Sequence, residues 1–175
     1  MATAASRREE KKMPDRLLSI YLNDHLGGAT LGVELSRRVG SSHDGSDERG
    51  RILSRIRAEI EADRATLERL TDRLGVRRSP VKPATAWAAE KLGRLKLNGR
   101  LRGYSPLSRV VELEGLGIAI TGKIQLWNAL ERTLGQGWEG FDFRDLAERA
   151  ERQRGAVEAL HRGAVAAAFS PADRD

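Results

Sequence analysis

Six ionisable side chains have the types and the helical spacing that metal binding or internal ion pairing requires. When each predicted helix is wound at about 100° per residue, these side chains fall on or beside its apolar stripe. They are Asp24, Glu59, Asp63, Glu114, Glu158 and His161. A carboxylate buried without a partner is costly enough to take up a proton or to unfold its helix. The inward acids therefore require a metal ion, cations or hydrogen-bond donors as partners.

Glu158 and His161 form a Glu-x-x-His pair, whose i, i+3 spacing places both side chains on one helix face. Together with the acids on the other three long helices, this pair resembles the ligand set of the ferritin-like superfamily of helical bundles, which hold two metal ions. The resemblance implies a four-helix bundle with a long connection before the third long helix. It also implies iron or manganese binding, with oxidase, oxygenase or storage activity.

The ferritin-like pattern is degenerate on the second long helix, because a second Glu-x-x-His pair is absent there. Ala62, and not a histidine, stands three residues after Glu59. Asp63 or His25 would have to supply the missing ligand. The chain also resembles small helical proteins common in actinobacteria, but this resemblance is one of overall texture and implies no function.

An internal salt-bridge network is the alternative to a metal site. Lys91 and Arg94 lie on one side of a predicted basic helix, and Arg154 lies on the predicted inner face of the last helix. These three cations could neutralise the inward acids. Such a network adds little net stability compared with apolar packing, but removal of one partner carries a large penalty. An organic anion bound among the cations is a third possibility.

The basic residues concentrate in one segment. The chain has a formal net charge of +6, and between residues 77 and 103 eight basic residues stand against one acid. Four of these basic residues are predicted to face solvent and could contact phosphates: Arg77, Arg78, Lys96 and Arg100. Without interleaved aromatic residues, such contacts predict non-specific, salt-sensitive nucleic-acid binding. A solvated charged face is the simpler interpretation.

The positioning elements are predicted to be helices throughout. Apolar residues recur at helical spacing, and no useful length alternates with the period of two that strands require. The predicted helices span residues 15–39, 47–74, 84–102, 106–134 and 142–169. Their lengths predict an all-α fold, an antiparallel four-helix bundle with a shorter helix in the long connection. We expect a tail at residues 1–13, one domain at residues 14–170 and a frayed end at residues 171–175.

Glycines inside the predicted helices need a physical reason, since each costs up to about 1 kcal/mol relative to alanine. Gly28, Gly32, Gly115 and Gly122 lie on or near the inward faces of their helices. Close approach of two helices is the ordinary explanation. A cavity is the other.

The composition and the absence of certain motifs exclude several classes of function. The chain has no cysteine and three histidines, so thiol catalysis and cysteine-built metal sites are excluded. No apolar run is long enough to span a bilayer and no signal peptide is evident, which predicts a cytoplasmic protein without a membrane partner. No phosphate-binding loop or nucleophile motif is present. The sequence therefore predicts a non-catalytic bundle that acts by self-association or by binding a protein partner, with ferritin-like metal binding as the alternative.

Overall fold

The computed structural model describes residues 15–41, 47–79 and 105–170, and within these ranges it is helical with no strand. Its elements are α1 (Arg16–Ser41), α2 (Glu48–Arg73), α4 (Pro106–Leu134), the short 3-10 helix η2 (Trp138–Gly140) and α5 (Phe143–Ala168). The predicted all-α class is confirmed for this part of the chain. The predicted helix at 84–102 and the predicted tails at 1–13 and 171–175 lie outside it.

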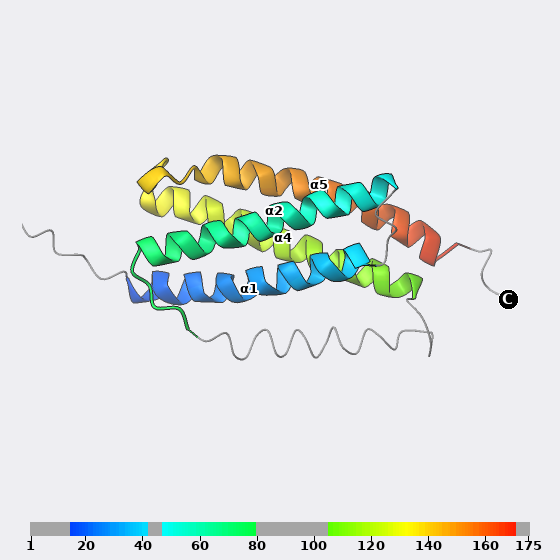
Figure 1. The fold of residues 1–175 in the computed structure, drawn as a ribbon, viewed down its shortest axis with the longest axis horizontal. Helices are drawn as coiled ribbons and strands as arrows, with labels where there is room; N and C mark the ends of the chain where they lie inside the picture. The colour runs from blue at the N-terminus through cyan, green and yellow to red at the C-terminus, as the bar shows by residue number, and fades with distance from the viewer. Residues whose placement is uncertain (1–14, 42–46, 80–104, 171–175) are drawn as a thin grey trace, which may run out of the picture.

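The four long helices lie side by side as a bundle (Figure 1). α1 packs against α2 and α4, and α5 packs most extensively against α4, whereas α2 and α5 approach each other closely at few points. Each helix runs opposite to the neighbours it packs against, so α2 and α4 run in the same direction (Figure 1). The end of α2 and the start of α4 therefore lie at opposite ends of the bundle (Figure 1).

Local signals set the helix ends. The Asp47 side chain caps α2 by accepting a hydrogen bond from the Gly50 amide at 2.6 Å, and Asp142 caps α5 in the same way. α2 ends in a Schellman motif, because Gly75 adopts a left-handed φ of 69° and the Val76 amide bonds back to the Thr71 carbonyl. The predicted ends of these helices are confirmed.

α4 begins at Pro106, as predicted, and Ser105 occupies the N-cap position, although its side chain makes no capping hydrogen bond. The helix is apolar around nearly its whole circumference, and this pattern is typical of a helix surrounded by protein. Among the described helices, none is both long and apolar enough to cross a bilayer.

The apolar core consists of two clusters. The first contains Ile60 of α2, Ile120 and Ile124 of α4 and Ala150 of α5, and the second contains Leu67 and Trp127. Asp63 lies in the sequence between Ile60 and Leu67, and Lys123 lies between Ile120 and Trp127. A polar layer thus separates the two apolar clusters near the middle of the bundle.

Candidate functional site

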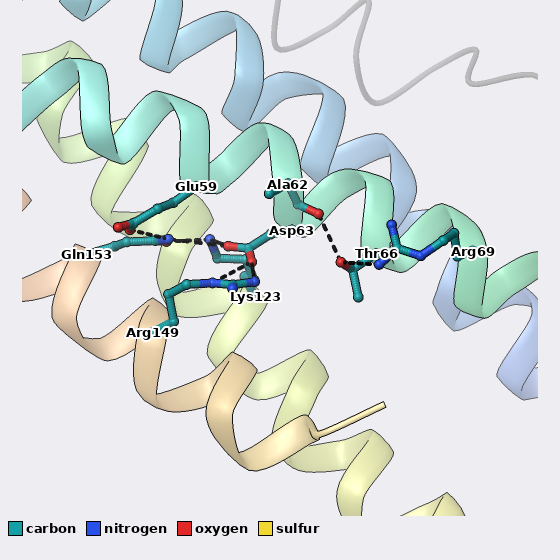
Figure 2. A network of polar contacts seen from close by, with 8 residues as sticks. All are labelled: Glu59, Ala62, Asp63, Thr66, Arg69, Lys123, Arg149 and Gln153. Carbon is teal, nitrogen blue, oxygen red and sulfur yellow. Dashed lines mark hydrogen bonds and ion pairs between the residues drawn. The ribbon is translucent and has the colours of Figure 1, made fainter. Parts of the chain in front are cut away.

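Asp63 is the centre of this polar layer and the most deeply buried acid of the six predicted site residues. It lies on the inner face of α2 and is 2% exposed. Lys123 reaches it from α4, and Arg149 and Gln153 reach it from α5 (Figure 2). We call these four residues the Asp63 network.

Both oxygens of Asp63 accept hydrogen bonds. Oδ1 accepts from Arg149, with the Arg149 Nε 3.0 Å away, and from its Nη2. Oδ2 accepts from the Lys123 ammonium and from Nε2 of Gln153 at 3.3 Å. Gln153 also links the network to Glu59, whose Oε2 is 2.9 Å from the same Nε2 (Figure 2). The acceptor oxygens of this buried carboxylate are therefore satisfied by side chains from α4 and α5.

The charges of this layer balance. Asp63 and Glu59 contribute two negative charges, and Lys123 and Arg149 contribute two positive charges. Burial lowers the pKa of Lys123 below its usual 10.5, and the neighbouring Asp63 carboxylate opposes that shift. The network joins α2 to α5, where these two helices otherwise make few close contacts. It therefore holds together the least packed side of the bundle.

A cavity of about 280 Å³ lies between α1, α2 and α4, next to Lys123 and Asp63. Most of its lining is apolar, from residues such as Leu116 and Trp127, and three helix glycines also line it: Gly28, Gly32 and Gly122. At Gly28 and Gly122 an added Cβ would meet no atom within 4 Å. At Gly115, in contrast, it would meet Leu35 at 3.5 Å. An alanine at Gly115 would thus make an ordinary van der Waals contact with α1, whereas Gly28 and Gly122 border the open space of the cavity.

His25 lines the same cavity from α1. Its ring contacts Tyr21 edge to face, with 4.5 Å between the ring centroids. Burial lowers the pKa of His25 below its usual 6.5, and the nearby Asp24 carboxylate opposes part of this shift. The imidazole is consequently held toward its neutral form at the cavity wall.

The six predicted site residues do not meet at one point. Glu114 and His161 contact each other across α4 and α5, 3.2 Å apart, on the outside of the bundle. Glu158 pairs with Arg154 at 3.6 Å, and Asp24 is exposed. In the part of the chain that the structure describes, no group of three or more histidine, aspartate and glutamate side chains could hold a metal ion. Two of the three donors around Asp63 are the cations Lys123 and Arg149, and such neighbours do not fit a divalent metal.

Three predicted orientations are wrong. Asp24 and Glu114 were expected to face inward and are exposed, and Arg154, expected on the inner face of α5, pairs with Glu151 and Glu158 with its side chain 40% exposed. Large apolar residues of the same two helices are also exposed, Leu17 of α1 at 73% and Ile118 of α4 at 74%. An apolar stripe indicates an inner face only where the opposite side of the helix is polar.

The buried acid of α4 is Glu112. It is 4% exposed and lies 3.8 Å from the Nε of Arg38 on α1. Internal salt bridges are therefore present, as one of the predicted alternatives proposed. Their cations are Arg38, Lys123 and Arg149, which are not among the predicted ones. Of the predicted cations, Lys91 and Arg94 lie outside the described residues.

Sequence reasoning missed Lys123, Arg149 and Gln153. One signal was available for Lys123, which is the single charged residue among positions 115–130 of the apolar helix α4. A lone lysine in such a run must either extend to solvent or find an acid inside the bundle. Arg149 and Gln153 offered no comparable signal, because α5 carries many polar residues.

The predicted basic surface is described only in part. Arg77 and Arg78 are both exposed, and Arg78 pairs with Asp72 at the end of α2. Lys96 and Arg100 lie outside the described ranges. Nucleic-acid binding through this segment stays a prediction.

Comparison with known proteins adds no assignment to this geometry. No protein-family model matches the chain, and no curated protein or solved structure is significantly similar to it. The functional argument therefore depends on the residues themselves.

Proposed function

We propose that this protein is a non-catalytic helical bundle that acts by self-association, with a second copy packed on the outer face of α4. We define the outer α4 face as Leu107, Val111, Glu114 and Ile118, which recur at intervals of four and three residues. This spacing is the one that helices use to pack along each other in coiled coils.

The exposure of Ile118 is the observation that carries the proposal. α4 is apolar nearly all round, yet Ile118 in the middle of the helix is 74% exposed and Leu107 is 36% exposed. Scattered exposed apolar residues are ordinary on a protein surface, but an apolar face along one helix is typical of an association surface. The α4 residues Gly117 and Gly122 beside Ile118 leave room for a close approach.

The charges beside this face favour a second copy as the occupant. Glu114 and Glu158 supply negative charge, and Arg154 and His161 supply positive or protonatable groups along the same α4–α5 groove. In a dimer with twofold symmetry the same patch meets itself, so a patch that carries both signs can pair with its copy. A patch whose charges all had the same sign would repel the identical patch on the second copy.

A ferritin-like relationship is a separate part of the proposal. It is supported by the helix order and by the parallel direction of α2 and α4, which places the end of α2 and the start of α4 at opposite ends of the bundle (Figure 1). The ferritin-like likeness extends to the helix arrangement alone, because Lys123 and Arg149 are the partners of Asp63. We therefore propose no metal chemistry at the Asp63 network.

Sedimentation equilibrium of the full chain tests the self-association. We expect a dimer for the wild type, and a weakening of the dimer by about tenfold or more for Ile118→Asp, because a charge would be buried at the interface. Leu17→Asp is the matched control, since Leu17 is exposed to the same degree, 73%, on a different helix. The control should leave the dimer intact.

Two results would contradict this proposal. One is a wild-type chain that sediments as a monomer throughout the concentration range. The other is a dimer that Ile118→Asp leaves unchanged while Leu17→Asp dissociates it, which would assign the interface to α1.

A further inference from the structure

The cavity beside Lys123 has a shape and a chemistry that packing alone does not explain. Gly28 and Gly122 sit inside helices, where alanine would be more stable by up to about 1 kcal/mol each. Nothing within 4 Å of their missing Cβ atoms prevents a larger residue. Both glycines line this space of about 280 Å³, which opens to solvent at the exposed Gly28.

The walls of the cavity favour an apolar ligand body. Leu67 lines it from α2, and Leu116, Ile120 and Trp127 line it from α4. Contact between these side chains and an apolar group would remove apolar surface from water on both sides. The volume lies near the lower end of the range for ligand pockets, so the ligand must be small.

The polar atoms near the cavity favour a hydrogen-bond acceptor as the ligand's head group. The Lys123 ammonium has three N–H groups, and within the described ranges two of them are used, by Asp63 and by Gln153. The indole Nε1 of Trp127, which is 1% exposed, has no hydrogen-bond partner among the described residues. Asp63, in contrast, already accepts from three side chains. The site thus has spare donors, whereas its central acceptor is already occupied.

We propose that this cavity is a binding site for a small apolar monocarboxylate, with its hydrocarbon part between α1, α2 and α4 and its carboxylate toward Lys123. The site is separate from the outer α4 face, so the two proposals stand or fall independently.

The charged residues at the site favour a carboxylate over other polar groups as the head group of the ligand. Asp63 and Glu59 balance Lys123 and Arg149 in the unliganded bundle, and burial opposes the positive charge of Lys123. A carboxylate beside Lys123 would stabilise that ammonium and accept its third N–H. Arg64 adds a second cation to the lining, and the carboxylate of Asp24, which also lines the cavity, is exposed to solvent. An ammonium ligand placed beside Lys123 would therefore be repelled.

Calorimetric titration of the full chain with octanoate, octylamine and octanol, each below its micelle-forming or solubility limit, tests the ligand class. We expect octanoate to bind with one site per chain, octanol to bind about tenfold more weakly or worse, and octylamine not to bind. Equal binding of octylamine and octanoate, or no binding of octanoate, would overturn the proposal.

A pair of glycine variants locates the site. Gly28→Leu adds a side chain to the cavity from α1, away from the α4–α5 groove, and should weaken octanoate binding by about tenfold or more. Gly155→Leu makes the same change on α5, where an added Cβ also meets nothing within 4 Å but the residue does not line this cavity. It should bind octanoate like the wild type. Equal loss in both variants, or no loss in Gly28→Leu, would place octanoate elsewhere.

Trp127→Phe tests the head-group contact while it keeps an aromatic ring in the wall. If the indole N–H donates to the carboxylate, the preference for octanoate over octanol should fall severalfold. Lys123→Met should abolish that preference, and a far-UV spectrum and an unfolding curve establish that each variant is folded. Should both variants retain the full preference for octanoate, the proposed head-group position is wrong.

Discussion

Asp63 and Glu114 are two acids with similar sequence surroundings and very different roles in the bundle. Each lies among apolar residues on its helix, and each contacts a basic side chain of α5. The Asp63 side chain is 2% exposed and has three polar partners, whereas the Glu114 side chain is 50% exposed and, among the described residues, pairs with His161. Solvent screens the second pair and not the first.

This difference shows that burial determines how much the loss of an ion pair destabilises the fold. Breaking a buried pair leaves a charge with neither water nor a partner, while a broken surface pair is hydrated at once. The Asp63 network therefore holds α2 against α4 and α5. The Glu114–His161 pair contributes charge to a surface.

The largest expected effect is that of Asp63→Ala. It leaves the half-buried cations Lys123 and Arg149 without their carboxylate, which should lower the free energy of unfolding by about 3–5 kcal/mol. Urea unfolding followed by far-UV circular dichroism measures this loss. Asp24→Ala removes an exposed carboxylate from α1 and is the control that should change little. A loss below about 1 kcal/mol for Asp63→Ala would remove the distinction between buried and surface pairs.

Replacing the network with apolar residues should recover most of that loss. In the triple variant Asp63→Leu, Lys123→Met, Arg149→Met no charge is stranded, because Gln153 still pairs with Glu59. The free energy of unfolding should return to within about 1 kcal/mol of the wild type or exceed it. The same urea experiment measures it. A triple variant as unstable as Asp63→Ala would mean that shape, and not charge, is lost at this site.

A pH experiment extends the comparison to the buried imidazole. Because burial lowers the pKa of His25 below 6.5, the unfolded chain takes up a proton more readily than the folded chain just below that pH. Stability from His25 is therefore present above pH 6.5 and is lost as the pH falls through the lowered pKa. His25→Asn should show a smaller fall in melting temperature than the wild type on going from about pH 7 to about pH 5.5. Identical slopes for the two proteins would contradict the assigned shift.

The smallest effect is expected for Glu114→Ala. Measured at a protein concentration where the chain is monomeric, the substitution should change the free energy of unfolding by about 0.5 kcal/mol or less. High salt should reduce even this difference. A loss comparable to that of Asp63→Ala would show that exposure does not separate the two pairs.

Much of the secondary structure could be predicted from the sequence because its signals are local. Asp47, Gly75 and Pro106 each specify a helix end through their own backbone or side-chain chemistry. Asp63 was placed correctly on the inner face of α2, since the opposite face of that helix is polar.

The partners of Asp63 could not be predicted in the same way. α4 is apolar on all sides, so its sequence does not distinguish the inner Glu112 from the outer Glu114. Lys123 and Arg149 reach Asp63 through long side chains, and that reach depends on how three helices are aligned along the bundle. Helix alignment is set by packing between elements and leaves no short-range signal in the sequence.

A double-mutant cycle between Asp63 and Arg149 tests the central claim most directly. Urea unfolding of the wild type, Asp63→Ala, Arg149→Ala and the double variant yields the coupling free energy between the two side chains. We predict a coupling of about 2 kcal/mol or more, against about 0.5 kcal/mol or less for the matching Glu114 and His161 cycle. Equal coupling in the two cycles would contradict the conclusion that the Asp63 network, and not the surface pair, holds the bundle together.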